Sequence, residues 1–257
     1  MKTLLYTGAR SGIAINTINK IINDDFYIYL TVHTDKQLEY IKEKYKDKKN
    51  IKCLKLDITN KSDRKILEEL DIDVLVNNAA IGEGGSLTEI DMNRVRHNFE
   101  VNVFSSFEIV QIVLKKMLEK DSGKIIIMSS LASIIPINFL GSYCGTKASI
   151  SQMARILQNE IKLLSNNIKV VLIEPGMYHT GFNQVMLDNK MDINSYFDEQ
   201  INQIRKKENF IFGFLEKKNY NFISNKIVKA IRSDNPKFIY RAPCLQAIGT
   251  KIYNIFR

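Results

Sequence analysis

Short apolar runs, rich in β-branched residues, alternate along the chain with longer segments that have the periodicity of a helix. The runs predict seven strands, at residues 3–7, 26–32, 51–56, 74–76, 124–128, 169–173 and 238–241. Strands that alternate with helices are joined by crossovers and pair in parallel. We therefore expect an α/β fold, in which a doubly wound parallel sheet of about seven strands carries helices on both faces.

Two helical segments carry signals for where they begin. Ser62 or Asp63 can cap a helix that runs to Leu70, and Asp91 can open a long helix over 91–118. Both starts place an oxygen-bearing side chain where the first backbone N–H groups of a helix lack partners.

A third helix is predicted over 143–164, where apolar residues recur at a spacing of roughly 3.6. This spacing predicts that one face of the helix lies in the core. The residues concerned are Ile150, Met153, Ile156, Leu157, Ile161 and Leu164.

The chain has 257 residues, of which 45% are hydrophobic. That composition can bury one substantial core, so we expect a single domain over 1–257. One long excursion from the alternation, 181–221, follows the sixth strand and mixes aromatic with charged residues. At the carboxyl end of a parallel sheet such a segment favours a substrate lid, and packing of a small core of its own is equally compatible with it.

Charge, cysteine and histidine patterns limit the classes of partner. The formal net charge of +9 would suit nucleic acid, an acidic carrier protein or anionic lipid. The cations are spread among Asp and Glu, however, which favours a solvated surface and no nucleic-acid partner. The three cysteines are isolated and the histidines match no metal spacing, so we expect no metal and a reduced, cytoplasmic protein. No run of about 18 apolar residues occurs, which argues against stable membrane insertion.

A glycine turn follows the first strand directly, at Thr7-Gly8-Ala9-Arg10-Ser11-Gly12-Ile13-Ala14. Glycines let a pyrophosphate approach backbone N–H groups at the start of a helix, where the helix dipole also favours negative charge. Because the turn follows a strand and opens the helix of the first βαβ unit, it predicts a dinucleotide site.

The end of the second strand bears on which dinucleotide binds. An NAD site would place Asp or Glu here to hold the ribose 2′-hydroxyl, whereas no acid follows this strand before Asp35. Arg10, His33 and Lys36 can approach a 2′-phosphate instead. We therefore expect NADP(H) in preference to NAD(H).

Farther along, a phenol and an amine lie one helical turn apart. Tyr143 and Lys147 share a face of the third helix, and a cation beside a phenol lowers its pKa from about 10. Ser130, which precedes them, can hold a substrate oxygen beside the phenol. This set predicts a proton donor for a carbonyl, and hence an enzyme.

Together these motifs resemble the classical short-chain dehydrogenase/reductase family over nearly the whole chain. In the family's order stand the turn from Thr7 to Ala14, Asp57, Asn77-Asn78-Ala79-Ala80, Asn102, Ser130, Tyr143-Cys144-Gly145-Thr146-Lys147, and Pro175-Gly176 followed by Thr180. Ala14 and Ala80 replace two usual glycines, which bears on the geometry of the pocket. The resemblance implies a Rossmann-like fold and an NAD(P)-dependent enzyme that transfers a hydride between a nicotinamide cofactor and a carbonyl or secondary alcohol.

The resemblance also implies roles for individual residues. Tyr143 would be the catalytic acid or base, and Ser130 would orient the substrate oxygen. Lys147 would lower the pKa of Tyr143 and bind the nicotinamide ribose. Asn102 would hold a water that links Lys147 to solvent, so that the proton donated by Tyr143 can be replaced. The cofactor would contact Gly8, Ala9, Arg10, Ser11, Gly12, Ile13, His33, Asp57, Ile58, Asn77, Tyr143, Lys147, Tyr178 and Thr180.

Substrate and assembly rest on less specific features. The aromatic excursion and an apolar tail, which contains Ile252, Tyr253, Ile255 and Phe256, favour an apolar or lipid-like substrate. A 3-oxoacyl-carrier protein is the alternative substrate, and a catalytically silent dinucleotide-binding regulator or scaffold is the alternative function. The tail fits peripheral membrane attachment less well than burial, because it lacks a long amphipathic pattern. The resemblance also implies a homodimer or homotetramer, paired through the helices at 102–118 and 143–164.

Overall fold

Seven parallel strands form one sheet in the order β3-β2-β1-β4-β5-β6-β7. The computed structural model describes residues 1–257 apart from 189–194, 201–202, 204–205, 207–212, 214 and 256–257. The strands are β1 (Lys2–Tyr6), β2 (Phe26–Val32), β3 (Ile51–Lys55), β4 (Val74–Asn77), β5 (Gly123–Met128), β6 (Ile168–Pro175) and β7 (Ile239–Ala242). The predicted α/β class and doubly wound parallel sheet are confirmed.

The central strands are buried on both faces. In β1 the side chains of Leu4 and Tyr6 join the core on one face of the sheet, and Leu5 joins the core on the other. All three are fully buried. Strands covered on both sides read as continuous apolar runs, which is why the strands were visible in the sequence.

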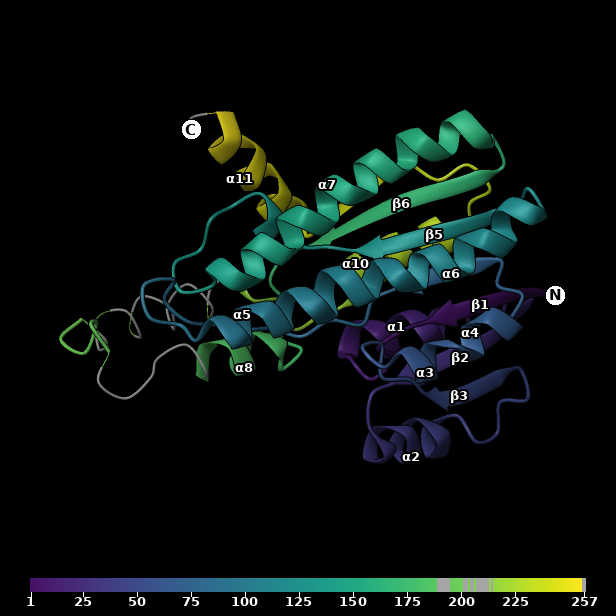
Figure 1. Ribbon diagram of the computed structural model, residues 1–257, viewed down its shortest axis with the longest axis horizontal. Helices are drawn as coiled ribbons and strands as arrows, with labels where there is room; N and C mark the ends of the chain where they lie inside the picture. The colour runs from purple at the N-terminus through teal and green to yellow at the C-terminus, as the bar shows by residue number, and fades with distance from the viewer. Residues whose placement is uncertain (189–194, 201–202, 204–205, 207–212, 214, 256–257) are drawn as a thin grey trace.

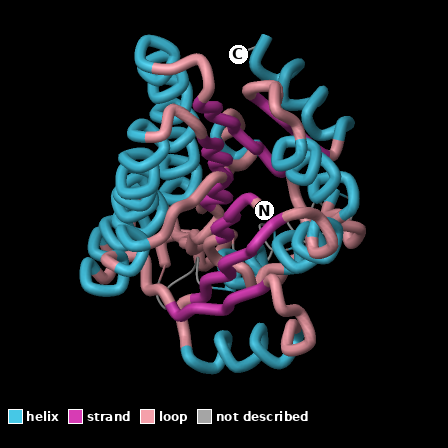
Figure 2. The backbone as a smooth tube through the Cα atoms, turned by 90° about the vertical axis from the view of Figure 1, so that its right-hand side faces the viewer, coloured by secondary structure: helices cyan, strands magenta, loops and turns pink. Residues whose placement is uncertain are grey.

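Helices cover each face of the sheet (Figures 1 and 2). The face that carries Leu4 packs against α1 (Gly12–Ile21), α2 (Asp35–Lys44) and α10 (Asn221–Arg232). The face that carries Leu5 packs against α6 (Ser106–Glu119) and α7 (Gly141–Leu164). Because β1 lies between β2 and β4, the chain reverses its strand order beside β1, and this is the switch point where open α/β sheets bind ligands.

The helix predicted to run to Leu70 is two short helices, α3 (Lys61–Arg64) and α4 (Ile66–Glu69). Its predicted cap is wrong as well. Asn60 caps α3, because its Oδ1 accepts hydrogen bonds from the backbone N–H groups of Ser62 at 2.8 Å and Asp63 at 3.4 Å.

The long helix that Asp91 was predicted to open has an irregular centre. Asp91 caps α5 (Met92–Phe99) by accepting from the N–H of Asn93 at 2.9 Å, as predicted. Between α5 and α6, residues Glu100–Ser105 form a π-helical turn. Such turns insert one extra residue into a helix and are frequent at functional sites, and this one carries Asn102.

Helix α7 begins at Gly141, just before the predicted start, and its core face is narrower than predicted. Ile150 and Ile161 are buried, but Ile156 is 48% exposed and Leu164 is 68% exposed. The prediction that these last two face the core is wrong, because in this fold the sheet covers only one side of the helix.

The excursion at 181–221 is closed at its base. The N–H of Lys217 donates to the carbonyl of Met177, and the N–H of His179 donates to the carbonyl of Lys217, each at 3.0 Å. Helix α8 (Phe182–Asp188) starts the excursion, and much of the remainder lies outside the described residues. The described chain ends in α11 (Cys244–Ile255). Within the described part of the chain, no helix is long and apolar enough to cross a membrane.

Candidate active site

A cavity of about 910 Å³ opens where the strands end at their carboxyl termini. Its walls come from the loops after β1, β4, β5, β6 and β7 and from α7, α8 and α11. The lining residues include Gly8, Ser11, Ile13, Asn78, Ala80, Ser130, Tyr143, Lys147, Gly176, Tyr178 and Thr180. The structure therefore gathers the glycine turn, the phenol and the amine, which are far apart in the sequence, around one cavity.

Ser130 and Tyr143 both line this cavity, and the hydroxyl of Ser130 lies near enough to the phenol to affect its pKa. Ser130 follows β5 and opens a short 3₁₀ helix (Leu131–Ser133). The ring of Tyr143 packs 5.5 Å from that of Phe182. Burial raises the pKa of Tyr143, and the nearby hydroxyl of Ser130 lowers it in part.

The amine of Lys147 lies beside the phenol. Its Nζ is 5.7 Å from the centre of the Tyr143 ring and donates to the carbonyl of Met128 at 3.2 Å. Burial lowers the pKa of Lys147 to about 8. The expected lowering of the Tyr143 pKa is absent from this structure, because burial of the phenol outweighs the other influences on it.

Asn102 is buried and bonded entirely to protein groups. Its Oδ1 accepts from the N–H of Ile81 at 2.8 Å, and its Nδ2 donates to the carbonyl of Ile81 and to Oδ1 of Asn98. A longer bond of 3.2 Å reaches Thr146 on α7. Asn102 thus joins the loop after β4 to the helix that carries Tyr143, and its role in holding a water stays a prediction.

The glycine turn is held from the neighbouring strand. Gly8 has φ +65°, and a Cβ there would lie 2.8 Å from the Cα of Ala79, so both conformation and space require glycine. The amide of Asn78 donates to the carbonyl groups of Thr7 and Gly8 at 2.9 and 3.0 Å. Ser11 caps α1 by accepting from the N–H of Ala14 at 3.2 Å. Asn78, which the site prediction omitted, therefore shapes the turn.

The predicted adenosine end lies at the tips of β2 and β3. Nε2 of His33 lies 3.4 Å from Oδ2 of Asp57, while the backbone N–H and hydroxyl of Thr59 donate to Oδ1. Burial alone would raise the pKa of Asp57, but the bonds from Thr59 and the proximity of His33 outweigh it and hold that pKa below its usual value. Ile58 is buried behind this pair, and Arg10 is exposed.

Of three other residues predicted to contact the cofactor, two line the cavity and one does not. Tyr178 and Thr180 line the cavity, and the buried hydroxyl of Tyr178 has no hydrogen-bond partner among the described residues. Asn77 does not line it. The Nδ2 of Asn77 donates to the carbonyl and the hydroxyl of Ser106 on α6, each at 2.9 Å, so its side chain is engaged away from the cavity.

Helix α11 was missed as part of the site. Gln246 joins two walls of the cavity, because its Oε1 accepts from the N–H of Met177 and its Nε2 donates to the carbonyl of Leu215, at 2.8 and 2.7 Å. Cys244, Leu245, Gly249 and Thr250 of the same helix also line the cavity. The apolar tail in the sequence could have indicated that this helix lines the cavity, but it was interpreted as a segment buried in the fold or in a subunit interface. No group of potential metal ligands occurs among the residues whose positions are described.

Residues 2–190, a span that contains the glycine turn, Ser130, Tyr143 and Lys147, match the short chain dehydrogenase family. The chain belongs to that family. The match confirms the resemblance drawn from the motifs. This chain is therefore an NAD(P)-dependent oxidoreductase that acts on CH–OH groups.

Individual relatives of this short-chain dehydrogenase share less than a third of its residues. The probable short-chain type dehydrogenase/reductase VdlC of Helicobacter pylori is 29% identical, over 86% of this chain and 81% of its own. The NADPH-dependent 3-dehydrocapnine reductase of Ornithobacterium rhinotracheale is 28% identical, over 70% of this chain and 66% of its own. A short chain dehydrogenase/reductase from Burkholderia phymatum, solved in complex with NAD, has the same fold, with a TM-score of 0.82 at 18% identity over 97% and 92% of the two chains.

Proposed function

We propose that this enzyme reduces a carbonyl group of an apolar small molecule to an alcohol and takes its hydride from NADPH. The observation that carries the proposal is that the hydroxyl groups of Ser130 and Tyr143 lie near each other at the wall of a large cavity. Two hydroxyl groups so paired can bind one substrate oxygen and pass it a proton.

The residues around the glycine turn fit the phosphates of a dinucleotide. Gly8, Ser11 and Ile13 line the cavity, and the backbone N–H groups of Gly12 and Ile13 have no acceptor within their helix. Such free N–H groups at a helix start favour anions. The buried, unpartnered hydroxyl of Tyr178 gives a further polar atom on the same side of the sheet. When bound, NADPH supplies the hydride, and the protein sets its position.

The protein's own residues would handle the proton. Tyr143 would donate its proton to the substrate oxygen while Ser130 holds that oxygen in place. Lys147, beside the phenol, would stabilise the phenolate that remains. Asn102 would keep the loop after β4 fixed against α7 and hold the water that returns the proton.

Preference for NADPH rests on the end of β2. The side chain there is His33 and not an acid, and the exposed side chains of Arg10 and Lys36 are near in sequence to the expected phosphate site. His33 already faces Asp57, which would hold it close to the ribose. One relative is named for its use of NADPH, which agrees with this preference.

An apolar substrate is supported by the walls of the cavity beyond Tyr143. They include the side chains of Ile135, Ile137, Leu140, Phe182, Met186, Leu215, Phe222 and Leu245. Several of these come from 181–221, the segment that we propose as the lid. An apolar chain of the substrate would exchange water for this surface on binding.

The test is a screen of ketones and aldehydes in which the absorbance of NADPH is followed. We expect turnover of apolar carbonyl compounds and tighter binding of NADPH than of NADH in a fluorescence titration. Binding of the cofactor without turnover of any compound, together with an unchanged cellular product in the Tyr143→Phe strain, would instead identify a regulator.

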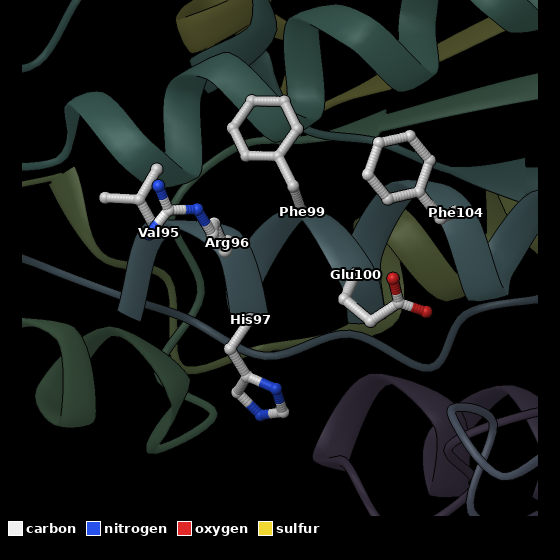
Figure 3. Close-up of a pocket in the computed structure, with 6 residues that line it drawn as sticks. All are labelled: Val95, Arg96, His97, Phe99, Glu100 and Phe104. Carbon is white, nitrogen blue, oxygen red and sulfur yellow. The ribbon is translucent and has the colours of Figure 1, made fainter. Parts of the chain in front are cut away.

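We also propose a homodimer or homotetramer formed through the helices at 102–118 and 143–164, which correspond to the end of the π turn with α6 and to α7. A hollow of about 550 Å³ lies along α5 and the π turn (Figure 3). The apolar side chain of Phe104 beside it is 57% exposed, and Ile156 on α7 is exposed too. Light scattering should give a dimer or a tetramer, and Phe104→Asp should shift it toward the monomer. A monomeric wild type would refute the proposal.

For the compartment we propose the cytoplasm. Cys53, Cys144 and Cys244 are all free thiols, and unpaired cysteines are usual where the surroundings are reducing. Fractionation of cells that express the protein tests this, and recovery with the membranes would contradict it.

A further inference from the structure

Lys217 is a cationic residue in the wall of a cavity that is lined mostly by apolar side chains. It is half-buried and lines the cavity, as do the apolar residues Leu215 and Phe222. Its backbone is fixed by the two hydrogen bonds that close the base of the excursion, to Met177 and from His179. The fold therefore fixes the main chain of Lys217 at the edge of the cavity.

The amine of Lys217 has no partner in the part of the chain that the structure describes. Among the described residues, no hydrogen bond or ion pair involves its Nζ, and no Asp or Glu is among the residues that line the cavity. Glu216, the adjacent acid, is engaged by other residues. Its two carboxylate oxygens are held by Nδ1 of His179 at 2.7 Å and by Nδ2 of Asn183 at 2.9 Å.

A cation that is partly removed from water without a counterion is costly unless a ligand supplies one. Lys147, the other cation of the cavity, is engaged beside Tyr143. We infer that Lys217 binds an anionic group of the substrate, so that the substrate is an apolar oxo compound with a carboxylate or phosphate group. This inference rests on the proposed carbonyl reduction and adds the charge of the substrate to it.

The net charge of the protein agrees with such a substrate. A formal charge of +9 attracts small anions toward the molecule at a distance, and Lys217 would give them a fixed site at the end of that path. An ammonium group against a carboxylate forms a charge-assisted hydrogen bond, which is about twice as strong as a neutral one.

The experiment compares medium-chain oxo acids with their methyl esters, which differ only in the charge. Binding to the enzyme saturated with NADP⁺ is measured by calorimetry, and kcat/KM for reduction is measured with NADPH. The wild type should favour the acid. In Lys217→Met the affinity and kcat/KM for the acid should fall by about tenfold or more, with little change for the ester, and Lys217→Arg should retain the preference.

Lys218→Met is the matched control, because Lys218 is exposed and does not line the cavity. It should leave the preference intact. Equal affinity of the wild type for acid and ester, or an equal loss of both in Lys217→Met, would overturn the inference. A matching loss of NADPH affinity in Lys217→Met would overturn it too, since the amine would then serve the cofactor phosphates. Binding of the acid without reduction of acid or ester would count against the proposed reaction and leave the anion site standing.

Discussion

Oε2 of Glu174 accepts a hydrogen bond of 2.5 Å from Nε of Arg241, which ties the end of β6 to β7 inside the core. Glu174 is fully buried, and its Oε1 lies 3.2 Å from the hydroxyl of Ser151 on α7. Ser151 lies 2.7 Å from the hydroxyl of Ser129, which also bonds to the carbonyl of Lys147. Hydrogen bonds through Ser151 and Ser129 thus link the ion pair between β6 and β7 to the backbone of Lys147, one of the proposed catalytic residues.

We predict that Glu174→Ala lowers the free energy of unfolding by about 3–5 kcal/mol, because it leaves the charge of Arg241 without its buried partner. Urea unfolding measures the loss. The double variant Glu174→Ala with Arg241→Met should recover part of it, since the nearer of the two charges left unpaired, those of Arg241 and Arg155, is then removed. If the double variant loses the sum of the two single losses, Glu174 and Arg241 do not act as a pair.

Replacement of the phenol separates chemistry from cofactor binding. We predict that Tyr143→Phe lowers kcat by about 10²- to 10⁴-fold, because it removes the proton donor and keeps the ring that packs against Phe182. NADPH affinity, measured by fluorescence titration, should change little. A variant that keeps its kcat would exclude Tyr143 as the acid.

Lys147 should make the protein less stable near neutral pH. Burial lowers the pKa of Lys147 from 10.5 to about 8. Below pH 8 the amine is charged in both states, but the charge is buried in the folded protein and solvated in the unfolded chain, so it destabilises the fold. As the pH rises from about 8 to 10.5, the unfolded chain binds more protons than the folded one, and the penalty disappears. At pH 7 its size is at most about 3 kcal/mol.

We therefore predict that Lys147→Met raises the free energy of unfolding at neutral pH while it abolishes reduction. Urea unfolding of both proteins at about pH 7 and pH 10 should show the gain shrinking at the higher pH. A gain that is equal at the two pH values would show that packing of the Met side chain, and not removal of a buried charge, is its cause.

The sheet and the glycine turn could be predicted from the sequence because each requires particular residue types. Strands buried on both faces are continuous apolar runs, and the glycine turn must contain glycine at Gly8, where φ is positive. The π turn around Asn102 could not be predicted, because it depends on a bond pattern that no residue type specifies. The contribution of Gln246 was equally hidden, since its two partners are brought near only when α11 folds back over the loop after β6.

The shape of the glycine turn gives the last prediction. Gly8→Ala would place a methyl group 2.8 Å from the Cα of Ala79 and force a left-handed conformation on a residue with a side chain. The conformation alone costs about 1–2 kcal/mol, and the contact must shift the backbone that faces the cavity. We predict a lower free energy of unfolding and a loss of NADPH affinity of about tenfold or more in fluorescence titration.

Gly181→Ala separates the two effects of the Gly8 substitution. Gly181 has φ +78°, but a Cβ there would meet no atom of the described residues within 4 Å, and Gly181 is not among the described residues that line the cavity. In urea unfolding, this variant should therefore lose a similar free energy of unfolding from the left-handed conformation alone. It should bind NADPH like the wild type. If Gly8→Ala also binds NADPH normally, the close approach of this turn is not needed for the dinucleotide. The anion would then be held by the free N–H groups of α1 whatever the position of Gly8.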